Sequence, residues 1–213
     1  MTVPDGQGLR EPEPTAVWSH NPMPFSIEST ALDEVKIVVP ERMPDGRGFF
    51  MEVYRQDLFA RLGLPDRFLQ LNHSRSTKGV VRGLHFQWDP PMGKLMRVVM
   101  GRAFLVAVDI RLGSPTAGSW VGLEGDAEDP RQLWAPASFA RGFCVLSEVA
   151  EIEYLTTGTY NHATEGGIRW NDPDIGIDWP VSNPILSAKD ESAPTLAEWL
   201  ASPNASQFTF RQD

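Results

Sequence analysis

The chain has 213 residues, a length that suits one compact domain with short tails. Its 41% hydrophobic and 22% charged residues are ordinary for a globular protein, and its net charge of −9 argues against nonspecific nucleic-acid binding. No apolar run approaches the roughly 18 residues of a membrane span, and residues 1–25 lack the pattern of a signal peptide. The single cysteine, Cys144, excludes an intramolecular disulfide and suits a reducing cytosol. We therefore expect a cytoplasmic protein that binds neither nucleic acid nor membrane.

Along the chain, residues 1–25 are rich in Pro, Gly and Glu, which predicts a mobile tail or an arm laid on a neighbouring subunit. Residues 26–200 carry short runs of β-branched and aromatic residues between turn residues, with one helix predicted within 51–62 and another around 196–200. Residues 201–213 are predicted to form a C-terminal tail. The predicted strands are 35–39, 68–72, 79–87, 94–100, 103–111, 119–124, 131–134, 140–146, 150–155 and 167–170. This spacing is typical of a mainly β domain, an antiparallel sandwich or barrel with short flanking helices.

One of the four histidines, His85, stands out because it alternates with Leu84 and Phe86 on a predicted strand and so faces the other side of the sheet. On a regular strand Gln87 would share the face of His85, whereas Arg82 would point the opposite way. One imidazole beside a glutamine and scattered carboxylates is a poor metal site, so we expect no metal and no other cofactor. A free imidazole can act as a general base near neutral pH.

The partners of such a base stay open at this level. Lys94 follows a Pro-rich turn close in sequence to His85, and is either a solvated loop residue or a cation that stabilises an oxyanion. Tyr154 lies on a later predicted strand, where it could serve packing alone. The chain has no Gly-rich phosphate-binding loop, so cationic side chains would have to hold a phosphate. The candidates are Arg47, Arg82, Lys189, Arg75, Arg141 and Arg169.

Several sequence blocks carry a family resemblance from about Phe25 to Leu200. They are Asp45–Glu52, Asn72–Ser74, Val81–Gln87, Gly93–Leu95, Val108–Arg111, Gln132–Trp134, Gly166–Asp172 and Leu186–Asp190. In this order they resemble the bacterial dTDP-4-dehydrorhamnose 3,5-epimerase family. The resemblance implies a double-stranded β-helix, the cupin or jelly-roll fold, and a homodimer that exchanges terminal segments between its subunits. It also implies an isomerase that inverts C3 and C5 of a dTDP-linked 4-keto-6-deoxyhexose.

The resemblance further implies roles for individual residues. His85 corresponds to the general base and Asp190 to the carboxylate that orients it. Lys94 corresponds to the residue that stabilises the enolate, and Tyr154 to the acid that returns a proton from the opposite face. The positions that contact the substrate fall on Arg47, Glu52, Gln70, Asn72, Arg82, Arg141, Tyr160, Glu165 and Lys189. Of these, Arg82 and Lys189 would meet the diphosphate, and the ring of Tyr160 would stack on the nucleotide base.

The chain departs from the family pattern at a few positions. Arg141 stands where the family usually has a histidine, Leu71 where an acidic residue is common, and Trp88 lies in a shortened segment. These differences leave three alternatives open: a mono-epimerase acting at C3 or C5, an epimerase for another nucleotide-linked 4-keto sugar, and a non-catalytic nucleotide-sugar-binding cupin. A 3,4-ketoisomerase and a metal-dependent dioxygenase fit the residues less well.

Overall fold

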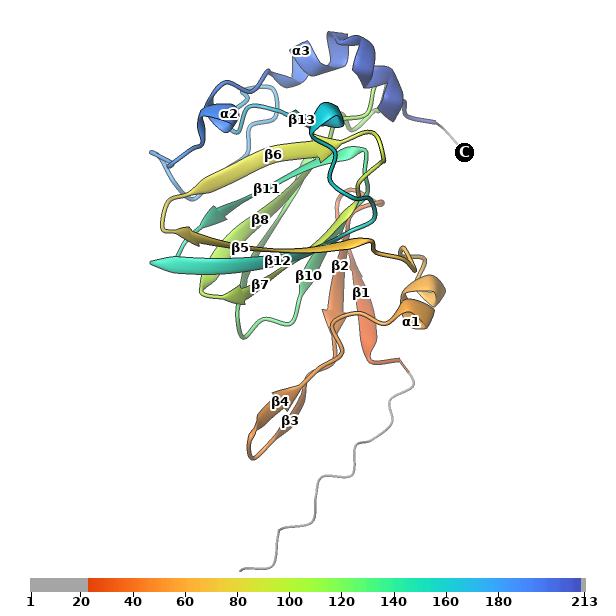
Figure 1. Ribbon diagram of the computed structural model, residues 1–213, viewed down its shortest axis with the longest axis vertical. Coiled ribbons are helices and arrows are strands. Elements are labelled where there is room, and N and C mark those ends of the chain that lie inside the picture. The colour runs from red at the N-terminus through yellow and green to blue at the C-terminus, as the bar shows by residue number, and fades with distance from the viewer. Residues whose placement is uncertain (1–22, 212–213) are drawn as a thin grey trace, which may run out of the picture.

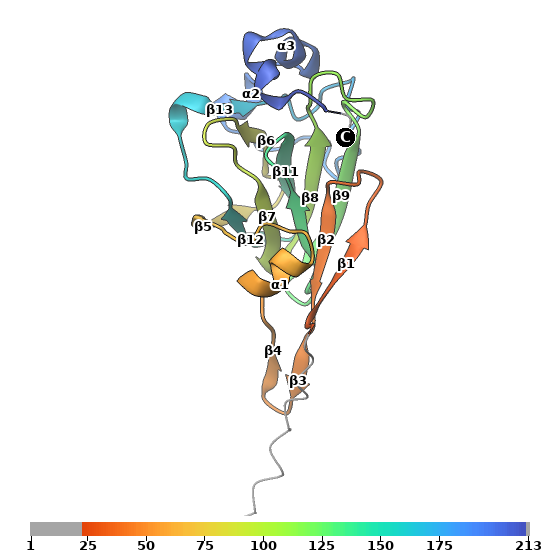
Figure 2. The same cartoon turned by 90° about the vertical axis from the view of Figure 1, so that its right-hand side faces the viewer.

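The computed structural model describes residues 23–211, which form a mainly β structure with a few short helices (Figures 1 and 2). The strands are β1 (Phe25–Ser29), β2 (Lys36–Pro40), β3 (Met43–Asp45), β4 (Gly48–Phe50), β5 (Gln70–Thr77), β6 (Val81–Gln87), β7 (Lys94–Met100), β8 (Arg102–Asp109), β9 (Trp120–Asp126), β10 (Gln132–Ala135), β11 (Phe139–Val145), β12 (Val149–Thr156) and β13 (Glu165–Gly167). The helices are α1 (Gln56–Arg61), α2 (Ala188–Glu191) and α3 (Leu196–Ala201), with 3-10 turns η1 (His162–Thr164) and η2 (Pro203–Phe208). The predicted jelly-roll fold class is confirmed.

Two antiparallel sheets face each other. One has six strands in the order β1-β2-β10-β7-β12-β5, and the other has five in the order β13-β6-β11-β8-β9. Neighbours in these orders are often far apart in sequence, so each sheet is assembled from strands of both halves of the chain. Figure 1 shows β5, β12 and β7 in front of and below β6, β11 and β8.

Strand β8 explains why the five-stranded sheet is buried on both faces. Ala103, Leu105 and Ala107 belong to the apolar cluster between the sheets, whereas Val106 and Val108 belong to a second cluster on the outer face. Because side chains alternate along a strand, a run in which every residue is apolar needs cover on both sides.

The cover on that outer face comes from the C-terminal segment. Helix α3 begins with a capping box between Thr195 and Glu198, and buries Leu196 and Trp199 against the sheet. The following turn η2 continues this layer with Phe208. The chain therefore stays packed well past residue 201, where the sequence analysis placed the start of a tail. The predicted N-terminal tail lies almost wholly outside the described residues.

A third feature is the β3–β4 hairpin, which projects from one end of the sandwich (Figures 1 and 2). Asp45 and Gly48 pair at its tip, where Gly48 takes a φ of 140°, a backbone conformation that glycine adopts readily. Phe50 is 52% exposed and Phe49 is also exposed, so the hairpin presents apolar rings to its surroundings. Among the described residues, none of the helices is long and apolar enough to cross a membrane.

Candidate active site

The candidate site begins with a pair formed by β6 and α2. The Nε2 atom of His85 lies 2.5 Å from Oδ1 of Asp190, which is buried, while His85 keeps part of its surface exposed. An ionised carboxylate only accepts hydrogen bonds, so in neutral His85 the proton sits on Nε2 and the lone pair on Nδ1. This arrangement prepares Nδ1 to take up a proton.

The short helix α2 holds the carboxylate in place. The Ser187 side chain caps the helix by accepting a hydrogen bond from the Asp190 N–H at 3.1 Å. Burial alone would raise the pKa of Asp190, but hydrogen bonds from His85, Ser187 and the Gly83 backbone hold the pKa of this carboxyl below its ordinary value. Ser187 is not among the residues predicted for the site, although a serine three residues before an acid is a helix-start signal.

Opposite His85, the six-stranded sheet presents two rows of polar side chains. Thr156 of β12 pairs with Lys94 of β7 on one side and with Gln70 of β5 on the other. In the next row on the same face, Tyr154 pairs with Asn72. Directly paired residues share one face of a sheet, and residues two apart on a strand also share it. The predicted residues of β5, β7 and β12 thus gather on the face that looks toward β6.

Lys94 lies between the sheets with its Nζ atom 5.1 Å from the centre of the Tyr154 ring. Burial lowers the pKa of Lys94 to about 7, and the nearby charge of Arg141 and then that of Lys189 act in the same direction. Glu165 opposes them by favouring the charged form. A lysine with a pKa this low exchanges its proton near neutral pH, which an ordinary surface lysine does not.

Tyr154 is held in its protonated form. Burial raises the pKa of Tyr154, with Glu165 adding to the effect and the cation of Arg82 opposing it. The phenol therefore keeps its proton at neutral pH and can donate it.

Arg82 stays exposed but lies on the same face of β6 as His85, because β6 is not the regular strand that the prediction of the opposite face required. Its Nε atom donates a 3.0 Å hydrogen bond to Ser76 of β5, across the space between the sheets. The cause is a bulge: Arg82 pairs with Phe143 and His85 with Arg141, so two residues of β6 between these pairs stand opposite the single residue Gly142 of β11. This irregularity turns both side chains to one face.

Glycines allow the close approach at this bulge. A Cβ atom on Gly83 would lie 2.7 Å from the Cα of Gly142 on the neighbouring strand, a distance that no side chain tolerates. Gly83 also has a φ of 135°, which disfavours any other residue.

A second polar group lies beside the pair on β13 and the following turns. The Glu165 carboxylate accepts from Lys189 Nζ at 2.5 Å and from the Tyr160 hydroxyl at 3.0 Å. Lys189 and its neighbour Asp190 thus reach the site from the same helix. His162, which the sequence leaves as an ordinary turn residue, brings its Nδ1 atom within 3.3 Å of the Tyr160 hydroxyl.

Gln87 has a structural task. Its amide nitrogen donates to the carbonyl oxygens of Pro90 and Thr159, both at 2.9 Å, and its oxygen accepts from the Asn161 N–H at 2.8 Å. The side chain braces two loops that border the site. No group of three or more His, Cys, Asp or Glu suited to a metal occurs within residues 23–211.

Two of the predicted residues lie elsewhere. Arg47 has 83% of its side chain exposed at the tip of the projecting β3–β4 hairpin, where it pairs with Asp45 at 2.6 Å. Glu52 follows the hairpin and pairs with Arg55 at 3.3 Å. The structure therefore does not bring Arg47 and Glu52 to His85 of the same chain.

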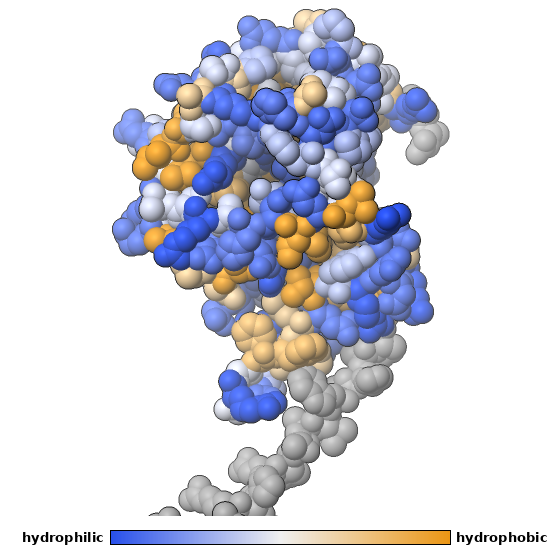
Figure 3. All heavy atoms as spheres, in the orientation of Figure 1, coloured by the Kyte–Doolittle hydropathy of each residue, from blue (hydrophilic) through white to orange (hydrophobic). Residues whose placement is uncertain are grey.

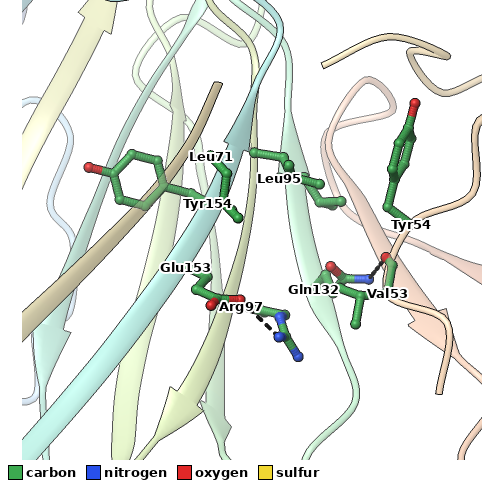
Figure 4. Close-up of a pocket in the computed structure, with 9 residues that line it drawn as sticks. Val53, Tyr54, Leu71, Leu95, Arg97, Gln132, Glu153 and Tyr154 are labelled. Atoms are coloured by element: carbon green, nitrogen blue, oxygen red, sulfur yellow. Dashed lines mark hydrogen bonds and ion pairs between the residues drawn. The ribbon is translucent and has the colours of Figure 1, made fainter. Parts of the chain in front are cut away.

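The outer face of the six-stranded sheet carries a separate cavity of about 300 Å³. Leu71, Leu95 and the Arg97–Glu153 ion pair line it, and Figure 4 shows the ring of Tyr154 pointing away from these residues. The sheet thus separates this cavity from the polar interior.

Comparison with known proteins decides the family. The sequence model of the dTDP-4-dehydrorhamnose 3,5-epimerase family matches residues 29–198. A dTDP-4-dehydrorhamnose 3,5-epimerase of Shigella flexneri is 52% identical over 168 residues, which is 78% of this chain and 93% of the relative. The chain belongs to the dTDP-4-dehydrorhamnose 3,5-epimerase family.

Other members of this epimerase family agree in fold and sequence. A relative of the same name from Neisseria gonorrhoeae is 51% identical over 82% of this chain, which spans only 53% of that longer protein. The crystal structure of a Legionella pneumophila 3,5-epimerase in complex with dTDP-4-keto-L-rhamnose superimposes with a TM-score of 0.82 at 44% identity, covering 89% of this chain and 100% of that one. The resemblance drawn from the sequence blocks is confirmed, and the chain is an epimerase of the isomerase class.

Proposed function

We propose that this epimerase inverts C3 and C5 of dTDP-4-dehydro-6-deoxyglucose, giving dTDP-4-dehydrorhamnose. One observation carries the proposal: His85 of the five-stranded sheet, paired with Asp190 of α2, lies on the face that looks toward Lys94 and Tyr154 of the six-stranded sheet. A sugar ring held between the sheets would have a base at one face and an acid at the other. Inversion of a carbon centre needs this arrangement, since the proton leaves from one face and returns to the other.

The first step is removal of a proton from the carbon beside the C4 ketone. His85 takes the proton on Nδ1, and Asp190 stabilises the imidazolium through Nε2. The electron pair of the broken C–H bond forms a carbon–carbon double bond, and the C4 carbonyl becomes an enolate. The ketone acidifies C3 and C5 alike, so the same pair of side chains can serve both carbons in turn.

Lys94 stabilises the enolate oxygen. An ammonium group in a water-poor interior interacts strongly with a developing negative charge. Because the pKa of Lys94 is lowered to about 7, a fraction of the free enzyme at neutral pH lacks this proton. A negatively charged ligand nearby favours the protonated form, so the substrate itself promotes the active state.

Tyr154 completes the inversion by donating its phenolic proton to the opposite face of the enolate. After one turnover His85 holds an additional proton and Tyr154 lacks one, and both return to their starting state by exchange with solvent. No redox or metal step is needed for this chemistry, so the proposal includes no cofactor.

Substrate binding falls to the polar groups around these four residues. Arg82 and Lys189 supply positive charge for the diphosphate, one as a planar fork and the other as a point charge. Tyr160 has an exposed ring beside Glu165 and is suited to stack on the nucleotide base. Gln70 connects Asn72 to Tyr160: its side chain donates to the Asn72 side chain at 2.7 Å and accepts from the Tyr160 N–H at 3.0 Å.

The proposal includes a homodimer, in which Arg47 and Glu52 of one subunit reach the site of the other. The β3–β4 hairpin that carries Arg47 projects from its own subunit and exposes two phenylalanines. The outer face of the six-stranded sheet offers an apolar surface: Leu71 is 59% exposed, and Figure 3 shows apolar side chains gathered between β5 and α1. Light scattering should give the mass of a dimer, and Leu71→Glu should shift it toward the monomer with a loss of activity. A wild-type monomer of full activity would contradict the exchange.

We also propose that the enzyme is cytoplasmic, as expected from the single cysteine.

The reaction is tested by incubating the protein with dTDP-4-dehydro-6-deoxyglucose in heavy water and following deuterium at C3 and C5 by NMR. We expect deuterium at both carbons, and a loss of at least 100-fold in His85→Ala, the usual scale for removing a general base. Binding of dTDP to the variant, measured by calorimetry, should change little.

The alternatives give different results. Deuterium at one carbon alone identifies a mono-epimerase. Binding without any deuterium identifies a protein that only binds the nucleotide sugar, or one that acts on another sugar. Full activity in His85→Ala would exclude His85 as the base.

A further inference from the structure

Arg141 is a buried cation without a carboxylate partner in the described part of the chain. It lies on β11 directly opposite His85 and is 2% exposed. Its Nε atom is buried and has no hydrogen-bond partner among residues 23–211. Burying an unpaired charge in a protein interior costs free energy. We therefore expect the Arg141 guanidinium to do more than fill space.

The two terminal nitrogens of Arg141 join two loops. Nη1 donates to the carbonyl oxygens of Pro136 at 2.7 Å and Phe139 at 2.5 Å, at the turn between β10 and β11. Nη2 donates to the carbonyl oxygen of Met92 at 2.6 Å, in the segment between β6 and β7. Met92 is two residues before Lys94, so the guanidinium fixes the backbone from which Lys94 extends.

The same segment is held from its other side. The Gly93 N–H donates to the Thr157 hydroxyl at 2.8 Å, and a Cβ atom on Gly93 would lie 2.4 Å from the Trp134 ring. With the backbone fixed before and at Gly93, the direction of the Lys94 side chain is set by its surroundings. The contact from Arg141 is the only one of these that also brings a charge.

Charged and titratable groups face Lys94 from every neighbouring element. They are Arg141 of β11, Tyr154 of β12, Glu165 of β13 and Lys189 of α2. Only Glu165 favours the ammonium form, and Glu165 already binds Lys189. Of the two cations that oppose it, Arg141 has the larger influence and is fixed by three hydrogen bonds.

We propose that Arg141 is a positioning residue, which places Lys94 through the Met92 carbonyl and sets a fixed positive charge beside the Lys94 ammonium group. The inference rests on the role of Lys94 in the proposed function. Arg141 acts through Lys94 and does not touch the reacting atoms. Its replacement should lower kcat, leave KM nearly unchanged and move the pH dependence, a combination that a purely structural role would not give.

The charge effect is tested without reference to activity. The chain has four lysines, Lys36, Lys78, Lys94 and Lys189, so the full-length protein can be labelled with ¹³C-lysine and each resonance followed with pH by NMR. Lys94→Met identifies the Lys94 signal. In the wild type its midpoint should lie near 7, as the lowered pKa requires. In Arg141→Met it should move upward by roughly one pH unit, the usual effect of removing a neighbouring like charge.

The positioning effect is tested with Arg141→Lys, which keeps the charge but cannot reach three carbonyls. Its Lys94 midpoint should stay close to that of the wild type, while kcat for deuterium exchange at pH 6 falls at least tenfold and KM changes less than threefold. Arg102→Met is the control, because it removes an exposed arginine on β8. Arg102→Met should change neither the titration midpoint of Lys94 nor kcat.

Two results would overturn the inference: an unchanged Lys94 midpoint in Arg141→Met, or an unchanged kcat at pH 6 in Arg141→Lys. If Arg141→Met does not fold, Arg141→Gln keeps amide donors without the charge and replaces it in the titration. Because the titration does not depend on turnover, its failure is distinct from failure of the proposed reaction, which the wild-type deuterium experiment detects.

Discussion

The interior between the two sheets has two halves that are built on the same strands. On β7 the inward positions run from Lys94 to Val98, and on β12 they run from Tyr154 to Ile152. On β11 they run from Arg141 to Val145. One half of the interior is therefore charged and the other apolar, although the backbone is continuous through both.

The two halves contribute differently to the protein. The apolar half supplies burial, which stabilises a folded chain by about 25 cal/mol per Å² of apolar surface removed from water. The charged half holds Lys94 and Arg141 in surroundings that lower the pKa of both, to about 7 and about 9 respectively. Burial of these charges lowers the free energy of unfolding, and the burial of apolar surface in the other half offsets that loss. Substitutions in the charged half should therefore lower activity without lowering stability. Substitutions in the apolar half should lower stability and leave activity nearly unchanged.

The largest effect on activity is expected for Lys94→Met in the charged half. Loss of the group that stabilises the enolate should slow deuterium exchange by about 10²–10³-fold, the usual scale for a missing oxyanion donor. The same change should raise the melting temperature at pH 6 by roughly 2–4 °C, since a partly buried cation is replaced by an apolar side chain of similar length.

The gain in stability should depend on pH in a defined direction. The lysine binds a proton up to about 10.5 in the unfolded chain but only up to about 7 in the folded one. The unfavourable burial of charge is thus fully present below 7 and disappears as the pH rises toward 10.5. The difference in melting temperature between Lys94→Met and the wild type should shrink over that range. A difference that is equal at pH 6 and pH 10 would show that Lys94 is not buried in its charged form.

A smaller effect is expected for Tyr154→Phe. Proton removal does not need the acid, so deuterium exchange should continue while inversion, measured by the product formed, slows roughly tenfold or more. The ratio of the deuterium-exchange rate to the inversion rate serves as an internal control, because a general distortion of the site would slow both rates equally. Equal losses would argue against separate roles for the base and the acid.

The smallest effect on activity is expected in the apolar half. Ile152 is fully buried two residues before Tyr154 on the same face. Ile152→Ala should lower the free energy of unfolding by about 2–5 kcal/mol, measured by denaturant titration, because it leaves a cavity in the core. The exchange rate of the folded protein at 20 °C should stay within about threefold. A loss as large as that of Lys94→Met would show that the two halves are not independent.

The sequence predicted most of the larger strands, because short runs of β-branched and aromatic residues between turn residues leave few other interpretations. It did not predict β1, β3 and β4, and it placed β13 too late in the chain. Three-residue strands such as β3 and β4 are too short to show an alternating pattern. Their existence depends on pairing that only the folded chain supplies.

The candidate site could be reached from the sequence through family motifs but not through spacing. His85 and Asp190 are 105 residues apart, and no periodicity relates them. The bulge opposite Arg141 reversed the side expected for Arg82, since alternation along a strand holds only while its register is regular. The hairpin removes Arg47 from its own site, which no local pattern indicates.

The position of Asp190 has a consequence for protein synthesis. Every strand, β1 to β13, precedes Ser187 to Asp190 in the chain, so His85 is synthesised 105 residues before its partner and gains that partner only when the last part of the chain has emerged. A chain cut short before residue 187 would lose Asp190 and also the α3–η2 layer that covers the outer face of the five-stranded sheet. Such a fragment would expose an apolar face in addition to lacking the partner of His85.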